Sequence, residues 1–341
     1  MTRALLSRTP LLLLVTATVA FVLFVSACGI FDDPGFIVYS EGEVGERDIV
    51  IVDPTGQNRR VVVGDESDDF APVWSPDQSR IAFLSDRDGN IELYVVTSDG
   101  ASMMRLTNSI VDESQPTWSP DSKRIAFTAP EVDGKPRIVW LALADLQQNR
   151  LIFGSESEFD PVWSPEGTWI AFTSLDERGE SEGLFLRNPD GVNELRISES
   201  SDRSPAWSPD SKKLAFVSTR DGNEELYFVN VGIHGPEGQA KRITDNPARD
   251  FAPAFSPDGG RIVFLSDRGA GIDIYTVSRT GEDLKTLTRN EVDELALAWG
   301  PDGRIVFESQ PAGKSGLFVM DSGGNQHQLS AGGLPSTQPD W

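Results

Sequence analysis

Short apolar segments alternate with polar turn segments along most of the chain, and the alternation has the same form each time it recurs. In each unit an apolar segment ends in Trp or Phe, a turn of the type Ser-Pro-Asp follows, and a second apolar segment such as 81–83 comes next. A Gly-containing polar loop then leads to a third segment such as 93–96, and another turn leads to a fourth that ends near residue 107. Proline presets φ in such turns, and Asp can bind the backbone ahead of it. Four short strands separated by turns predict the blade of a β-propeller.

The aromatic residue that ends each first strand marks the period of the repeat. Successive spacings are 44, 45, 44, 48, 44 and 42 residues, measured between Trp74, Trp118, Trp163, Trp207, Phe255, Trp299 and Trp341. This period is typical of four-stranded propeller blades. We interpret these aromatics as core residues packed between blades, where burial of each contributes about 2–3 kcal/mol.

The two ends of the repeated region complement each other. Residues 36–63 contain the second, third and fourth strands of a unit but lack the Trp-bearing first strand, which the segment 338–341 supplies. We therefore predict an all-β fold, a seven-bladed β-propeller of four-stranded blades, closed by pairing the C-terminal strand with the first blade. Closure removes exposed sheet edges that favour aggregation.

The N-terminal segment has the features of an export signal. Arg3 and Arg8 precede or flank an apolar run at 11–25, which is shorter than the roughly 20 residues that cross a bilayer. The sequence Val25-Ser26-Ala27-Cys28 follows and resembles the lipobox of bacterial lipoproteins, in which cleavage precedes the cysteine and its thiol is acylated. An ordinary secretory signal with an incidental cysteine and a short membrane anchor are the alternatives.

This resemblance divides the chain into three parts. We expect a lipoprotein signal peptide at 1–27, lipidated Cys28 with a short linker at 28–35, and the propeller at 36–341. More than one acyl chain makes release from a membrane slow, since each buried methylene contributes about 0.8 kcal/mol. The predicted location is therefore the outer side of a bacterial membrane, in the cell envelope or periplasm or at the cell surface.

Composition excludes several kinds of site and partner. The chain has 53 acidic and 30 basic residues and a formal net charge of −23, which argues against nucleic-acid binding because phosphate contacts need Lys or Arg. Cys28 is the single cysteine, and His234 and His327 are the two histidines, so we predict no zinc site of the Cys or Cys/His kind. We also expect no bound metal and no cofactor. We interpret both histidines as surface residues and expect a monomer.

The repeated unit resembles the WD40-like repeat of the TolB propeller family. The resemblance is carried by Pro-x-Trp-Ser-Pro-Asp at 72–77, Ile-Ala-Phe at 81–83, Ser-x-Arg-x-Gly at 85–89 and Leu-Tyr-Val-Val at 93–96, and it extends over 36–341. It implies the fold but not one function, because similar blades occur in periplasmic scaffold proteins, prolyl-oligopeptidase-type enzymes and pectin-degrading lyases. TolB is soluble and carries an additional N-terminal domain, for which we expect no room between Cys28 and Phe36.

An acidic residue lies five positions before the strand-ending aromatic in six of the seven units. These candidate channel-mouth residues are Asp69, Glu113, Glu158, Asp202, Asp250 and Glu294, and the seventh unit has Ser336. The loop between the second and third strands, expected on the same face, carries Arg87, Arg178, Arg220 and Arg268.

Two interpretations of these acids remain open. In one, acid–Arg pairs and backbone caps join adjacent blades. In the other, part of the set forms an acidic channel mouth that favours a cationic peptide, a polyamine or a metal ion, together with Asp68, Asp112, Asp160 and Asp293.

Motifs associated with catalysis are weak in this chain. Gly-x-Ser-x-Gly at 179–183 is expected in a loop rather than between a strand and a helix. Gly313-Lys314-Ser315 lacks the first glycine of a phosphate loop, and 86–92 departs from the spacing of a calcium loop. We therefore predict no catalytic residue and a non-catalytic envelope scaffold that binds a protein or peptide. A small-ligand sensor or substrate-binding propeller, and a sugar-lyase or hydrolase-type enzyme, are the alternatives.

Overall fold

The computed structural model describes residues 35–131, 133–150, 157–191, 193–198, 201–311, 315–330 and 336–341. The predicted signal peptide and Cys28 lie outside these residues. Twenty-eight strands in the described residues form seven four-stranded antiparallel sheets, and each sheet is one blade. The predicted seven-bladed propeller is therefore confirmed.

The blades are numbered in chain order, and their strands are given from the inner to the outer edge. Blade 1 consists of β28 (Ser336–Asp340), β1 (Ile37–Glu41), β2 (Asp48–Val52) and β3 (Arg60–Val63). Blade 2 consists of β4 (Asp69–Trp74), β5 (Arg80–Ser85), β6 (Glu92–Thr97) and β7 (Met103–Arg105). Blade 3 consists of β8 (Ser114–Trp118), β9 (Arg124–Pro130), β10 (Pro136–Ala142) and β11 (Gln148–Arg150). Blade 4 consists of β12 (Ser157–Trp163), β13 (Ile170–Leu175), β14 (Ser181–Arg187) and β15 (Glu194–Arg196).

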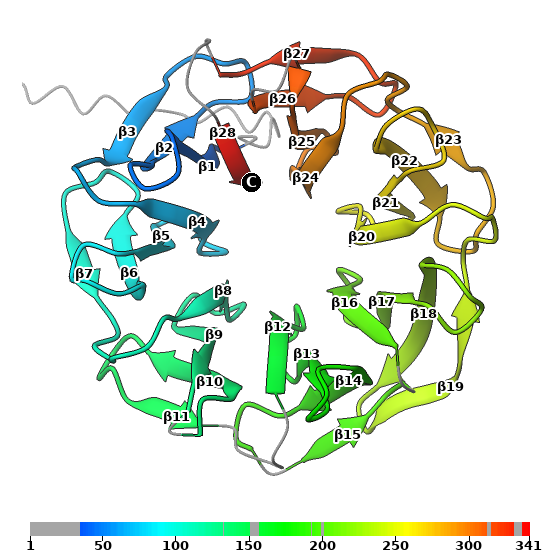
Figure 1. The fold of residues 1–341 in the computed structure, drawn as a ribbon, viewed down its shortest axis with the longest axis horizontal. Coiled ribbons are helices and arrows are strands. Elements are labelled where there is room, and N and C mark those ends of the chain that lie inside the picture. The colour runs from blue at the N-terminus through cyan, green and yellow to red at the C-terminus, as the bar shows by residue number, and fades with distance from the viewer. Residues whose placement is uncertain are drawn as a thin grey trace, which may run out of the picture. The chain divides into compact units, whose positions relative to one another are not determined.

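The remaining three blades repeat the same order. Blade 5 consists of β16 (Asp202–Trp207), β17 (Lys213–Ser218), β18 (Glu225–Gly232) and β19 (Gly235–Arg242). Blade 6 consists of β20 (Asp250–Phe255), β21 (Arg261–Ser266), β22 (Asp273–Ser278) and β23 (Lys285–Thr286). Blade 7 consists of β24 (Glu294–Trp299), β25 (Ile305–Ser309), β26 (Gly316–Met320) and β27 (Gln326–Gln328). Figure 1 shows the seven inner strands around the centre of the ring.

The C-terminal strand closes the ring, as predicted. β28 pairs antiparallel with β1, with Ser336 opposite Glu41 and Thr337 opposite Ser40. The same strand also binds blade 2: the Asp340 carboxylate accepts the backbone N–H of Trp74 at 2.7 Å. Blade 1 is thus assembled from both ends of the propeller and linked to the next blade in the chain.

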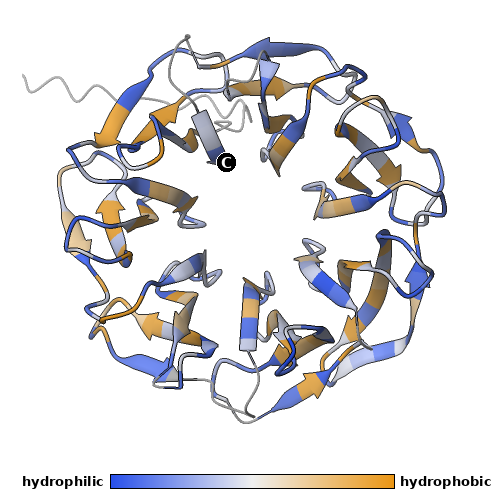
Figure 2. Ribbon diagram, viewed as in Figure 1, coloured by the Kyte–Doolittle hydropathy of each residue, from blue (hydrophilic) through white to orange (hydrophobic). Residues whose placement is uncertain are grey.

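Apolar residues lie mainly on the two middle strands of each blade, where they pack against neighbouring blades (Figure 2). One cluster joins Leu84 and Leu93 of blade 2 to Trp118 and Phe127 of blade 3. The prediction that the repeated Trp residues are core is confirmed for Trp74, Trp118 and Trp163, which are buried, while Trp207, Trp299 and Trp341 are half-buried.

Several tryptophans also join blades through the indole N–H. Trp118 donates to the Val73 carbonyl at 3.1 Å, and Trp207 and Trp299 donate to the corresponding carbonyls, Val162 and Ala254, at 3.2 Å. Each bond connects an inner strand to a neighbouring inner strand. The Trp at this position therefore orients two blades by a directional hydrogen bond and also buries apolar surface.

The inner strands carry a repeated backbone bulge. In six of them the residue before proline has a left-handed φ between 50° and 56°, at Ala71, Gln115, Asp160, Ser204, Ala252 and Gln338. Proline disfavours the right-handed helical region for the residue before it, and bulges use unusual conformations to redirect a strand. Two glutamines support this geometry, because Gln338 accepts the N–H of Ala71 at 2.8 Å and Gln115 accepts that of Asp160 at 3.0 Å.

Blade 7 provides an internal control for the cost of this conformation. Ala296 stands three residues before its strand-ending Trp, as Ala71 does in blade 2, but Leu297 follows it and its φ is not positive. A left-handed conformation costs a non-glycine residue about 1–2 kcal/mol. Glycine in an ordinary strand position costs roughly 0.5–1 kcal/mol relative to alanine.

We predict opposite outcomes for glycine at these positions. Ala71→Gly and Ala252→Gly should leave the free energy of unfolding unchanged or raise it by up to about 1 kcal/mol, because relief of strain offsets the entropy of glycine. Ala296→Gly should lower it by about 0.5–1 kcal/mol. Urea unfolding at equilibrium measures all three, and equal losses at the three sites would show that the left-handed conformation stores no strain.

Candidate functional site

The connections between strands lie on two faces of the propeller. Turns from first to second and from third to fourth strands lie on one face, which we call the turn face. Loops from second to third strands and the connections between blades lie on the opposite loop face, because successive strands of each blade run antiparallel. The six predicted acids stand at or next to the start of the inner strands, on the loop-face side.

Three of the six acids are aspartates that pair with a loop arginine of their own blade. Arg87 donates to both Asp69 oxygens at 2.8 and 2.9 Å, and Arg268 donates to both Asp250 oxygens at 2.6 Å. Arg220 donates to one oxygen of Asp202. The serine that ends the second strand holds each arginine, as Ser85 does by accepting from Arg87 Nε at 2.9 Å. These pairs lie within blades, so the expectation that they join adjacent blades is wrong for these pairs.

The three glutamates have no arginine at the corresponding loop position. Glu158 is bound instead by Arg187, whose Nη2 lies 2.7 Å from Oε1 and whose side chain is 1% exposed. Its other oxygen accepts the backbone N–H of Ile138 in blade 3 at 2.9 Å, so Glu158 does join two blades. Arg178, expected in the set of pairs, is exposed and forms ion pairs with Asp176 and Glu180 beside it.

Glu113 and Glu294 are buried beside a second carboxylate. Glu113 accepts a bond from Thr107 at 3.2 Å, and burial together with the charge of Glu92 raises its pKa to about 7. Asn290 donates to Glu294 and to Asp273, at 3.1 and 3.2 Å, while the remaining oxygen of each acid has no hydrogen-bond partner among the residues that the structure describes. Burial, and then the charge of Asp273, raises the pKa of Glu294 to about 7 as well.

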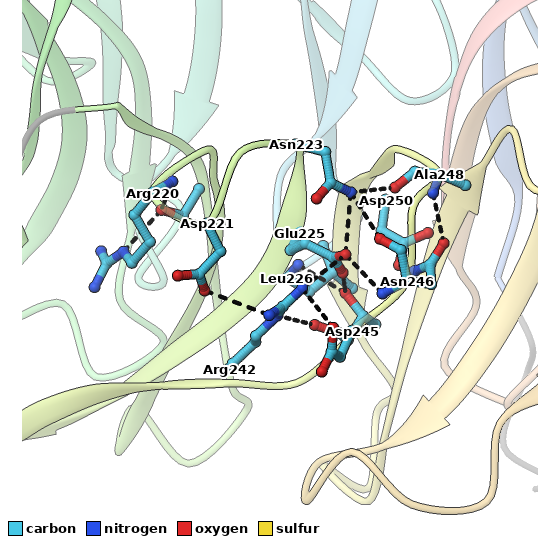
Figure 3. Close-up of polar contacts among 12 residues, drawn as sticks. Arg220, Asp221, Asn223, Glu225, Leu226, Arg242, Asp245, Asn246, Ala248 and Asp250 are labelled. Atoms are coloured by element: carbon cyan, nitrogen blue, oxygen red, sulfur yellow. Dashed lines mark hydrogen bonds and ion pairs between the residues drawn. The ribbon is translucent and has the colours of Figure 1, made fainter.

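A second set of buried acids was missed by the sequence analysis. Glu92, Glu225 and Asp273 begin the third strands of blades 2, 5 and 6 and are fully buried. Figure 3 shows Glu225, which accepts from Arg242 at 3.1 Å, from Asn223 at 3.1 Å and from the Asn246 backbone at 2.8 Å. Glu92 is held in the same way by Asn90, Arg105 and Ser109.

The sequence carries a signal for this second set. Gly-Asn-x-Glu precedes the third strand at 89–92, with the related Gly-Asn-Glu-Glu at 222–225, and Arg-x-Thr ends the fourth at 105–107 and 242–244. Both motifs occur together in blades 2 and 5, where the structure brings them into one cluster.

Three aspartates that stand one residue before a channel-mouth candidate accept backbone N–H groups of the preceding blade. Asp68, Asp112 and Asp293 accept the backbone N–H of Arg47, Ile91 and Ile272 at 3.2, 2.9 and 2.8 Å. Each donor belongs to the preceding blade, so these are the backbone caps that join blades. Asp160 instead accepts from Thr173 of its own blade and Gln115 of blade 3, and burial raises its pKa.

The six predicted acids do not form an open carboxylate surface. Their exposed fractions range from 0 to 3%, because the ends of the inner strands are covered by the loops and neighbouring blades. The exposed carboxylates of the loop face belong to other residues. In its described connections they are Glu43, Glu46, Asp65, Glu66, Asp86, Asp88, Asp112, Asp133, Glu177, Glu180, Asp221, Asp245, Glu291 and Asp293.

Few exposed cations balance these acids. Among the described loop-face connections the exposed ones are Arg178, Arg220, Arg249 and Arg289. Two apolar side chains also project from this face, Val44 with 85% and Ile110 with 97% of its surface exposed. No group of three or more His, Cys, Asp or Glu side chains within the described ranges is placed to hold a metal ion.

Comparison with known proteins assigns the family. A family model described as the TolB beta propeller domain matches residues 32–203 and 198–341. The chain belongs to the TolB β-propeller domain family. The resemblance predicted from the repeats is therefore confirmed.

A curated relative shares a short segment with this TolB-type propeller. Protein TolB homolog of Chlorobium luteolum is 36% identical over 75 residues, which are 20% of this chain and 17% of that protein. The chain thus spans about a sixth of the length of that relative in the match.

Solved structures share the fold at low sequence identity. TolB from Acinetobacter baumannii is 20% identical with a TM-score of 0.62, over 91% of this chain and 67% of that one. Oligogalacturonate lyase from Vibrio parahaemolyticus is 12% identical with a TM-score of 0.65, over 86% and 85% of the two chains. The β-propeller domain of the Trilobed protease from Pyrococcus furiosus is 15% identical with a TM-score of 0.69, over 87% and 95%, and is described as having an open velcro topology.

We predict that the two classes of buried acid respond oppositely to neutralisation. Asp250→Asn leaves Arg268 without its carboxylate and should cost about 1–3 kcal/mol at pH 8. Glu113→Gln and Glu294→Gln should leave stability at pH 8 unchanged or higher, because the amide replaces a charge that burial disfavours.

The raised pKa values determine how the free energy of unfolding changes with pH. Folding raises the pKa of Glu113 and Glu294 from the ordinary 4.5 to about 7, so the native state binds these protons more tightly than the unfolded chain. Their stabilisation is full below about pH 4.5 and is lost as the pH rises through 7. Urea unfolding between pH 4.5 and 8.5 should show this loss in the wild type and less of it in each glutamine variant. A wild type whose profile the two substitutions leave unaltered would contradict the assignment.

Proposed function

We propose that this chain is a non-catalytic, lipid-anchored scaffold of the bacterial envelope that binds a basic segment of a partner protein on its loop face. The observation that carries the proposal is the excess of exposed carboxylates over exposed cations on that face. Charge of one sign concentrated on one face steers an oppositely charged partner and excludes like-charged ones. Family membership and the propeller fold support a scaffold role without naming a partner.

Exposed apolar side chains on the loop face give this partner a second kind of contact. Val44 stands between Glu43 and Glu46, and Ile110 precedes Asp112. An apolar side chain surrounded by carboxylates fits a segment that presents an apolar residue between lysines or arginines. Burial of each such side chain contributes roughly 1.5–3 kcal/mol to binding.

The positions of the catalytic candidates support a non-catalytic role. Ser181 of the Gly-x-Ser-x-Gly sequence donates to the Asp202 carbonyl at 2.7 Å and lies at a blade junction. His327 belongs to the outer strand β27, with Nε2 at 3.1 Å from the Pro54 carbonyl, and His234 lies in the turn between β18 and β19. The six channel-mouth candidates are engaged in pairs and hydrogen bonds. A propeller enzyme of the lyase or peptidase kind remains the alternative that the binding assay below tests.

We predict that Cys28 determines membrane attachment. Cys28→Ser removes the thiol that would be acylated, so the variant should lose lipid labelling and leave the membrane fraction or accumulate unprocessed. Among the described residues, no helix has the length and apolarity of a membrane span. Metabolic labelling with a fatty-acid analogue followed by fractionation measures the effect, with Ser26→Ala as the control that keeps the cysteine. Lipid labelling that persists in Cys28→Ser would contradict the anchor.

We predict that neutralising the loop face weakens partner binding. The full chain is immobilised in neutral detergent, proteins of its native envelope are captured and identified, and the affinity of the purified partner is then measured. Glu43→Gln with Glu66→Gln should weaken binding about 5- to 10-fold at low salt, and wild-type binding should fall as salt rises. Glu237→Gln with Glu282→Gln removes two exposed acids elsewhere and should change affinity less than twofold.

Three results would contradict this proposal. The partner could bind the loop-face variant as well as the wild type, bind independently of salt, or be acted on chemically by the propeller. The last result would favour an enzyme.

A further inference from the structure

At three junctions of the described structure, a pair of buried acids lies on the loop-face side. One acid begins the third strand of the first blade, and the other stands at or next to the start of the inner strand of the next blade. Between blades 5 and 6 they are Glu225 and Asp250, and Asn246 binds both, through its backbone N–H at 2.8 Å and its side-chain amide at 2.7 Å (Figure 3). Each acid also has an arginine: Arg242 binds Glu225 at 3.1 Å, and Arg268 binds Asp250 at 2.6 Å.

The corresponding acids between blades 6 and 7 are Asp273 and Glu294. Asn290 binds both, through its backbone N–H at 3.2 Å and its side-chain amide at 3.1 Å. Asp273 is 0% and Glu294 is 1% exposed, yet Asp273 Oδ2 and Glu294 Oε2 have no hydrogen-bond partner among the described residues. The arrangement around the asparagine is thus the same as between blades 5 and 6, but one oxygen of each acid is unsatisfied.

Neither arginine of the blade 5–6 junction has a counterpart in this one. Thr286 occupies in β23 the position that Arg242 has in β19, since each is paired with the tyrosine of its third strand. Pro311 stands two residues after β25, as Arg268 stands two residues after β21. Buried carboxylates need a cation or a full set of hydrogen bonds, and this pair has neither within the part of the chain that the structure describes.

The loop before Asp273 has also lost its side chains. Gly269 and Gly271 stand at the positions that Asp221 and Asn223 have in blade 5. A Cβ on Gly269 would meet Asp273 Oδ2, so only glycine can stand beside that oxygen. Together with the missing arginine, these glycines remove the side chains that fill this space in blade 5.

The charges around the pair leave it negative. Burial raises the pKa of both acids, and the charge of Asp293 adds to the rise, while Arg289 opposes it for Asp273. Arg289 is exposed, and no ion pair of it occurs among the described residues. At pH 8 both acids are ionised in the absence of a ligand, because the pKa of Glu294 is about 7. A cation that enters this junction therefore meets two carboxylates without a bound counter-charge.

The protein itself shows which cation suits this arrangement. In blades 2 and 5 the acid of the third strand binds a guanidinium, and Arg105 contacts Glu92 at 2.7 Å and Asp88 at 2.9 Å. A guanidinium is planar, stays protonated and presents several N–H groups in one plane, so it donates to two carboxylates at once. An ammonium group is more strongly hydrated and loses more on burial.

We propose that the junction between blades 6 and 7 binds the guanidinium group of a ligand between Asp273 and Glu294, where blades 2 and 5 hold the arginine of their own outer strand. The guanidinium donates to Asp273 Oδ2 and Glu294 Oε2, the two oxygens without a partner. Because both acids are buried, the ligand presents this group at the end of a narrow chain. The site is separate from the exposed carboxylates proposed to bind a partner protein.

The test is calorimetric titration of the full chain in neutral detergent with agmatine, at pH 8 and constant ionic strength. Asp273→Asn and Glu294→Gln should each weaken binding at least about fivefold, because each removes one of the two charges that hold the guanidinium. Glu113→Gln is the matched control and should change the dissociation constant less than about twofold. Glu113 is the corresponding acid between blades 2 and 3, where Arg105 is present.

Two further substitutions test the charge balance of the site. Thr286→Arg restores the arginine of the repeat, so it should raise the melting temperature and abolish agmatine binding. Arg289→Gln removes an opposing charge and should tighten binding about two- to threefold. Melting temperatures of all variants are measured in parallel, so that a loss of binding is distinguished from a loss of folding. Glu43→Gln with Glu66→Gln should have no effect on agmatine, which separates this site from the partner surface.

The choice of ligand defines the chemistry. Putrescine has the charge of agmatine with an ammonium in place of the guanidinium and should bind at least about tenfold more weakly. N-acetylarginine amide represents an arginine side chain in a peptide. Binding of this amide alone assigns a protein arginine as the source, binding of agmatine alone assigns a free guanidino compound, and either supports the site.

Four results would overturn the proposal. Neither guanidino ligand could bind at about 10 mM, which would mean that protonation of Glu294 alone satisfies the pair. Putrescine or calcium could bind as tightly as agmatine. Glu113→Gln could weaken binding as much as Glu294→Gln, or Thr286→Arg could leave it unchanged in a folded protein.

Discussion

Burial of apolar surface between neighbouring blades is the interaction on which the rest of this structure depends. A single blade has two apolar faces and cannot cover them, so each hydrophobic cluster combines residues of adjacent blades, as Leu84 and Phe127 do between blades 2 and 3. The arrangement is complete only when the last blade contacts the first. Pairing of β28 with β1, and the cluster of Ile37 and Tyr39 with Val306 and Leu317, supply that last junction.

Close packing of blades forces polar groups at the loop-face ends of the strands out of water, and each junction satisfies them differently. Where the inner strand begins with Asp, as at Asp250, an arginine of the same blade reaches it across the bulged strand pair. Where Glu takes that place, its longer side chain reaches the neighbouring blade or a second carboxylate, as Glu158 and Glu113 do. The choice between Asp and Glu thus follows the presence or absence of the loop arginine, since buried charges need partners.

Because these acids are buried between and within blades, the side chains available to a binding partner are those exposed on the two faces. On the loop face, the described connections have more exposed carboxylates than exposed cations. Solved structures that share the fold include TolB, a lyase and a protease propeller, so the scaffold does not determine the chemistry.

The repeat pattern by itself determined the strand order, the number of blades and the closure, because each depends on local signals that recur along the chain. Trp118 and its counterparts mark the period, and the missing first strand of residues 36–63 reappears at 338–341. Tertiary structure alone decided the partners of the charged groups. Arg178 is the arginine that the sequence places in the loop near Glu158, yet Arg187 of the third strand binds this acid, because strand register points Arg187 into the junction and leaves Arg178 in solvent. The burial of Glu92 was decided in the same way, since it depends on which neighbouring segments cover the residue and not on the residues beside it in the chain.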